Sequence, residues 1–108
     1  MAKHEFGIME SAPISGKRYD EYEPEKYNCI SVDDDYIEGI EQLCAFDSFC
    51  HTVDIPMKGL NYCGVTLIPP MSITAFLSAI REGSEYESLR KLLIDAENRD
   101  KFVIHYGL

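Results

Sequence analysis

Histidine and cysteine are the side chains of this sequence best suited to proton transfer and nucleophilic attack. His105 is the first candidate, because an imidazole with an ordinary pKa of about 6.5 suits a general base near neutral pH. A base needs a nucleophile or substrate within hydrogen-bond reach. We expect Cys50 and Tyr62 on the same sheet face as His105, but the sequence does not show which strands are neighbours. We therefore favour a structural His105 bonded by its neighbours, and keep the general base as the alternative.

Sequence motifs add little support for catalysis. Cys50 and His51 are adjacent, so within one strand their side chains point to opposite faces and form no dyad. The chain contains no G-x-S-x-G nucleophile turn, no G-x-G-x-x-G and no phosphate-binding glycine loop. These observations favour a protein that is not an enzyme and that uses no cofactor.

The acidic and cysteine-containing segments do not match metal sites. The acids at 33–35 are consecutive, whereas a calcium loop spaces its ligands at alternate positions and adds a glycine, so we assign them to the start of a helix. The cysteines lack the paired spacing of a zinc site. No export signal begins the sequence, so we expect free thiols, a cytoplasmic location and no bound metal. The four cysteines are Cys29, Cys44, Cys50 and Cys63.

The charge of the chain is acidic and unevenly distributed. The formal net charge is −9, and residues 1–41 hold eleven acids and four bases, a net of −7. Such a surface repels phosphate backbones, so we expect no nucleic-acid partner. No apolar run approaches the ~20 residues of a membrane span. The acidity suits either a basic protein partner or simple solubility.

The first part of the chain differs from the rest. Residues 1–27 are predicted to form an irregular, acidic, tyrosine-rich arm, apart from a short strand over 6–9, because neither a helical nor a strand period fits them. The arm should lie on the domain formed by residues 28–108. Its candidate partner-binding residues are Tyr19, Tyr22, Glu23 and Tyr27.

Residues 28–106 carry regular periodicities that predict an α+β domain. Four strands are expected at 29–32, 49–53, 62–68 and 102–106, with a hairpin between the second and third. One helix follows the first strand and ends near 45. Two more occupy 72–82 and 84–96, with Ser72 as the first cap and Ser84–Glu87 as a capping box. This βαββ(αα)β order resembles ferredoxin-like folds, in which helices cover one face of an antiparallel sheet.

Strand parity identifies a possible binding face. Placing Val65 and Leu67 toward the helices, with Phe49 and Ile104 matched to them, leaves a mixed surface on the other side of the sheet. We expect the arm to cover that surface, a second subunit to cover it, or the surface to form the floor of a ligand pocket. Its candidate binding residues are Cys50, Thr52, Tyr62, Thr66 and His105.

Three functions follow from these observations. The first is a non-enzymatic interaction or regulatory module that forms a homodimer through its sheet or its arm. The second is an acidic inhibitor or immunity-type protein that neutralises a basic partner. The third is a small-molecule binder or enzyme that uses the open sheet face, with Tyr62 and His105 as its polar groups.

Overall fold

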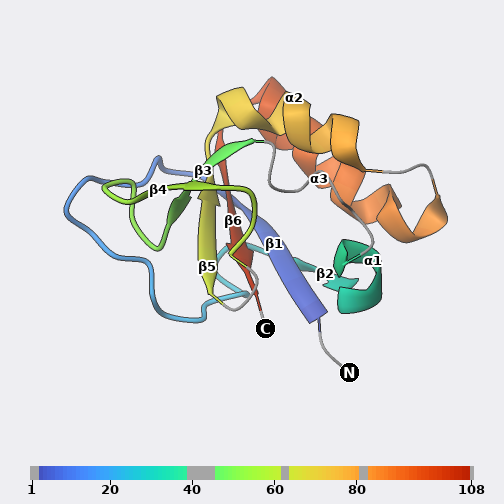
Figure 1. Cartoon of the computed structure of the whole chain (residues 1–108), viewed down its shortest axis with the longest axis horizontal. Helices are drawn as coiled ribbons and strands as arrows, with labels where there is room; N and C mark the ends of the chain where they lie inside the picture. The colour runs from blue at the N-terminus through green and yellow to red at the C-terminus, as the bar shows by residue number, and fades with distance from the viewer. Residues whose placement is uncertain (1–2, 39–45, 62–63, 81–82, 108) are drawn as a thin grey trace.

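A computed structural model describes residues 3–38, 46–61, 64–80 and 83–107 of the chain. The molecule is α+β, with an antiparallel sheet of six strands and helices packed on one of its faces (Figure 1). The strands are β1 (Lys3–Met9), β2 (Ile30–Asp33), β3 (Asp47–Cys50), β4 (Pro56–Lys58), β5 (Val65–Ile68) and β6 (Phe102–Tyr106). The helices are α1 (Asp34–Glu38), α2 (Pro70–Ala79), the 3-10 turn η1 (Ser84–Tyr86) and α3 (Glu87–Asn98).

The strand order is β2-β1-β6-β5-β3-β4, so the ferredoxin-like topology is not confirmed. Two strands that the sequence did not place in the sheet account for part of the difference, and the order of the other strands also differs. β1 extends the expected short strand to Lys3–Met9 and pairs with both β2 and β6. β4 forms inside the connection between the two strands of the predicted hairpin and pairs with β3 at one edge of the sheet. The irregular segment therefore starts at Glu10, after a strand that lies well inside the sheet.

The helices begin and end close to their sequence signals, with two differences. The capping box expected at Ser84–Glu87 does not form: Ser84–Tyr86 is the 3-10 turn η1, and α3 begins at Glu87 without a side-chain cap. α2 starts at Pro70 instead of at a Ser72 cap, because proline suits a first helical position where its missing N–H costs nothing. Ser72 Oγ instead donates to the carbonyl oxygen of Asp47, at 2.6 Å. At the start of α1 the side chain of Asp33 accepts a hydrogen bond from the Asp35 N–H, at 3.1 Å, which agrees with the assignment of these acids to a helix start. The remainder of that expected helix lies outside the described residues.

Both faces of the sheet are buried, and some residues that were predicted to face the helices lie on the opposite face. Phe6, Ile68 and Val103 pack with α2 and α3, whereas Leu67 and Ile104 belong to a second apolar cluster on the other face. β5 is buried at every position, so alternation of apolar and polar residues gave no guide to its helix side. The predicted matching of Phe49, Val65, Leu67 and Ile104 is correct, but the four face away from the helices.

The arm supplies the second layer. Tyr19, Tyr27 and Cys29 pack against the apolar cluster on the face opposite α2 and α3 (Figure 1). The approach is close where the arm crosses β1: a Cβ on Gly7 would lie 2.6 Å from the Tyr27 Cβ and 2.8 Å from the Cys29 Sγ. A side chain at position 7 would therefore push the arm off the sheet. The arm therefore covers the face that holds Leu67 and Ile104, whereas Thr66 and His105, which were predicted for the mixed surface, lie on the helix side.

Candidate functional site

Strand register brings together three of the five residues predicted as a binding face. Cys50 on β3 is the Cα partner of Thr66 on β5, and Thr66 is the partner of His105 on β6. His105 in turn is opposite Phe6, whose ring packs edge-on against Phe76 of α2. The row therefore lies on the helix side of the sheet, not on the side that parity predicted, and Thr66 and His105 are fully buried.

A chain of hydrogen bonds continues this row into β1 and α1. The Nε2 atom of His4 is 2.9 Å from Oδ1 of Asp34, and its Nδ1 is 2.8 Å from Nε2 of His105. The Nδ1 of His105 is 3.1 Å from the Thr66 hydroxyl, which also accepts from the Asn61 N–H at 2.8 Å. We call this set the buried polar chain: Asp34, His4, His105 and Thr66.

With both rings neutral, one arrangement of hydrogens satisfies the ring nitrogens of the buried polar chain. A carboxylate only accepts, so His4 carries its hydrogen on Nε2 and a neutral His4 accepts at Nδ1. His105 must then donate from Nε2 and accept at Nδ1 from the Thr66 hydroxyl. Every polar atom in the row is satisfied with both rings neutral, and such full satisfaction is what a buried network needs for stability.

Burial also sets the protonation of His105. Loss of solvent lowers the pKa of His105 to about 3, and a positive charge on His4 would act in the same direction. The hollows described below are lined by other residues. A group that is neutral, fully bonded and absent from the lining of these hollows fits a structural histidine and lacks the substrate access of a general base.

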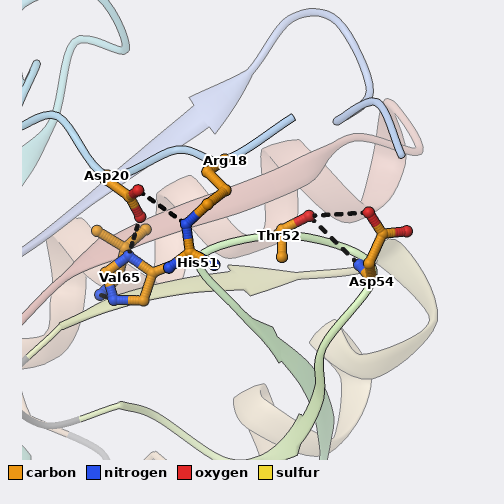
Figure 2. A network of polar contacts seen from close by, with 6 residues as sticks. All are labelled: Arg18, Asp20, His51, Thr52, Asp54 and Val65. Atoms are coloured by element: carbon orange, nitrogen blue, oxygen red, sulfur yellow. Dashed lines mark hydrogen bonds and ion pairs between the residues drawn. The ribbon is translucent and has the colours of Figure 1, made fainter. Parts of the chain in front are cut away.

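The remaining predicted face residues do not join this row. Thr52 lies beyond β3, and its hydroxyl donates to Oδ2 of Asp54 at 3.3 Å (Figure 2). Tyr62 falls outside the described residues, as do Cys44 and Cys63. Cys29 and Cys50 are free thiols, and burial raises the pKa of the Cys29 thiol to about 12. A thiol that stays protonated is a poor nucleophile.

His51 forms a separate polar contact that fastens the arm to the sheet (Figure 2). Its Nδ1 is 2.7 Å from Oδ1 of Asp20, close enough for an ion pair although the geometry falls outside that of a hydrogen bond. Arg18 Nε donates to the other carboxylate oxygen of Asp20 at 2.9 Å. The Tyr19 N–H donates to the carbonyl oxygen of His51 at 2.8 Å. His51 adopts φ 61°, unusual outside glycine, so the chain turns out of β3 at this residue.

A second carboxylate holds the same arm on the other side of the turn. Asp54 accepts from the Ser15 hydroxyl and from the Gly16 N–H, and these bonds lower the pKa of its carboxyl group. The pKa of Asp20 is likewise lowered, first by its hydrogen bond to Arg18. Both carboxylates join the arm to residues 51–54, so we call these contacts the arm latch. Their geometry serves attachment, and the small hollow beside the arm is lined by Arg18 and Asp20 but not by His51.

The arm residues predicted to bind a partner are mostly used internally. Tyr19 and Tyr27 pack on the sheet, and the Glu23 N–H donates to the Tyr106 hydroxyl at 3.3 Å. Tyr22 is 62% exposed, but its ring packs edge-on against Tyr106 and its hydroxyl bonds Glu5. Tyr19, Glu23 and Tyr27 also line a small hollow of about 280 Å³. The charges in that hollow are largely paired already, by Arg18 with Asp20 and Lys26 with Glu23.

One feature that the sequence reading missed is an apolar surface at the end of the sheet beside β4. A hollow of about 600 Å³ there is lined mainly by apolar side chains. A second hollow, of about 590 Å³, adjoins it and shares Pro69, Met71 and Phe102 with the first. Met71 stands between them and is 85% exposed, the most exposed of the large apolar side chains described. We call this region the Met71 surface; its apolar members are Phe49, Pro56, Met57, Pro69, Met71 and Phe102.

The sequence held a weak signal for the Met71 surface. Pro69 and Pro70 were read only as the end of a strand, and Met71 falls outside the helical face that Ile73 and Phe76 define. A methionine exposed at a helix start, next to rigid prolines, is a feature of adaptable binding surfaces. Only the fold shows that Phe49, Met57 and Phe102, from three different strands, line the same hollow as Met71.

Comparison with known proteins gives no further guide, since no family model matches the chain and neither a curated protein nor a solved structure matches it. Within the described residues, no helix has the length and apolar character needed to cross a bilayer. Any function must therefore be argued from the site itself.

Proposed function

We propose that this protein is a non-enzymatic interaction module that binds a protein partner through the Met71 surface. The observation that carries the proposal is the 85% exposure of Met71 between two adjoining hollows, at the convergence of four sheet and helix elements. Contiguous apolar surface that is left exposed on a small domain is a common mark of a binding site. Its volume of about 600 Å³ suits one or two large side chains.

The other candidate sites support the proposal by exclusion. The hollows described above are not lined by the buried polar chain, and the arm latch uses its charges on contacts within the chain. An enzyme would need a base, a nucleophile and room for a substrate in one place. Among the described residues these three features do not coincide, so binding without catalysis fits the geometry better.

Selection from a phage-displayed library of random peptides tests this function. Enriched peptides should bind the purified protein, and Met71→Asp should weaken their binding at least about tenfold, since a charge would enter the apolar contact. Ile94→Asp is the matched control, because Ile94 is an exposed apolar residue of α3 that lines neither hollow. Enriched peptides that bind Met71→Asp as tightly as the parent protein would refute the proposal.

The homodimer expected from the sequence is a distinct version of the same proposal. Each copy carries a net charge of −9, so two copies repel one another and need a large apolar interface to associate. Sedimentation velocity distinguishes the two versions. If the protein is a dimer and Met71→Asp dissociates it, the partner is a second copy of the chain. If the protein is a monomer at high micromolar concentration, the partner is a different protein.

A further inference from the structure

The two hollows of the Met71 surface differ in chemistry although they adjoin. The hollow beside β4 is lined by Phe49, Met57, Pro69 and Phe102, and its only charged pair, Asp47 with Lys58, is joined in an ion pair. Net charge is therefore absent from that side. An apolar side chain fits there without leaving a polar group unpaired.

The hollow on the other side of Met71 is acidic. Glu97 and Asp100 line it from the end of α3 and the turn that follows. Lys101 also lines it, but its amino group donates to the carbonyl oxygen of Glu10 at 2.7 Å. Glu97 accepts a hydrogen bond from Thr74, which holds the carboxylate at the hollow. With the charge of Lys101 counted, Glu97 and Asp100 leave the lining with a net charge of −1, which suits a cation.

We infer that the Met71 surface recognises a segment of a partner protein in which an apolar side chain is followed closely by a lysine or arginine. The apolar side chain occupies the hollow beside β4, and the cation lies against Glu97 and Asp100 across Met71. This inference rests on the proposed function and specifies its partner. The net charge of −9 over the whole chain favours the same basic partner and increases its rate of association.

Strand addition is an alternative way for a partner to reach this region, and the edge strand opposes it. β4 has only three residues, Pro56–Lys58. Pro56 lacks an N–H to pair, and a lysine such as Lys58 on an edge strand disfavours pairing with another chain. Side chains of the partner, not its backbone, should therefore supply the contact.

Titration calorimetry with matched peptides tests the inference. The first probe is a short synthetic peptide with a leucine–phenylalanine pair followed by two lysines; the second replaces both lysines by glutamine, and the third by glutamate. We expect affinity to fall about fivefold from lysine to glutamine and further with glutamate, the effect of an exposed ion pair. Raising the salt concentration should weaken the lysine peptide and leave the glutamine peptide unchanged.

The charge variants locate the effect. Glu97→Gln with Asp100→Asn should bring the lysine peptide down to the affinity of the glutamine peptide. Glu87→Gln, which makes the same change near the start of α3 and outside both hollows, should change nothing. If the lysine and glutamine peptides bind equally, or if the double variant has no effect, the inference is wrong while the proposed function stands. If none of the three peptides binds and library selection also fails, both are wrong.

Discussion

Two regions of this molecule break the rule that polar groups face water and apolar groups lie inside, and they break it in opposite ways. The buried polar chain places two histidines, a threonine and a carboxylate beneath α2 and α3, where His4 and His105 are fully buried. The Met71 surface exposes Met71 and Pro56 to solvent and leaves Phe49, Met57 and Phe102 half-buried. Buried polar groups and exposed apolar patches are the informative exceptions in a small domain.

The contrast shows that chemical reactivity and accessibility are separated here. The side chains that a sequence marks as reactive are enclosed and fully bonded, so they affect stability. The side chains that the sequence marks as structural are exposed, so they are available for binding. Changes in the first region should alter unfolding, and changes in the second should alter association.

Acid should have the largest effect on the first region. The pKa of His105 is lowered to about 3 in the folded state, below the unfolded value of about 6.5. Between these values the unfolded chain binds more protons, so the stability from neutral His105 is present above pH 6.5 and lost as pH falls toward 3. The loss is on the order of 4 kcal/mol. Urea unfolding at several pH values measures it, and His105→Gln should flatten the dependence.

Removing the imidazole should cost nearly as much at neutral pH. His105→Leu leaves Nδ1 of His4 and the Thr66 hydroxyl without their partner, at a cost of about 3 kcal/mol in unfolding free energy. His105→Gln keeps polar atoms in the row and should recover part of this. Chemical denaturation of the two variants decides the matter: equal stabilities for leucine and glutamine would mean that the hydrogen bonds contribute nothing.

The arm latch should have a smaller, local effect. Asp20→Asn weakens the exposed contacts to His51 and Arg18, so global stability should fall by less than about 1 kcal/mol. Trypsin should nevertheless cleave the arm faster, at Lys17, Arg18 or Lys26, because local opening exposes it. Glu21→Gln, an exposed acid on the same arm, is the control. Unchanged cleavage of the Asp20 variant would show that the latch does not hold the arm.

Met71→Ser should have the smallest effect on stability. Its side chain is 85% exposed, so the unfolding free energy should change by no more than about 0.5 kcal/mol. Binding of library-selected peptides should weaken all the same. A large loss of stability with intact binding would instead show that Met71 acts in the core, and that the Met71 surface affects stability and not association.

Sequence patterns predicted local elements better than their arrangement. The period of Leu89 and Leu93 gave α3, and the alternation near Phe102 gave β6, because each depends on neighbours along the chain. The place of β1 inside the sheet and the pairing of β4 depend on distant partners, which one sequence does not show. β5 is buried on both faces, so its sequence lacks the apolar–polar alternation from which the helix side of a strand is predicted. The predicted face of His105 was wrong for this reason.

The candidate site was predicted only in part, for the same reason. Cys50, Thr66 and His105 were expected on one face and are neighbours in register. Their partners in the buried polar chain, His4 and Asp34, come from the segment read as an arm and from a helix start. The Met71 surface gathers residues from β3, β4, β6 and α2, a set that no local pattern connects.

Backbone amide chemical-shift mapping tests the central claim most directly. Titrating the ¹⁵N-labelled protein with the lysine-containing peptide should shift amides of Met57, Lys58, Met71, Lys101 and Phe102, all of which line one of the two hollows. Amides of His4, Thr66 and His105 should stay in place. Shifts centred on the buried polar chain or on the arm latch, with none around Met71, would contradict the account.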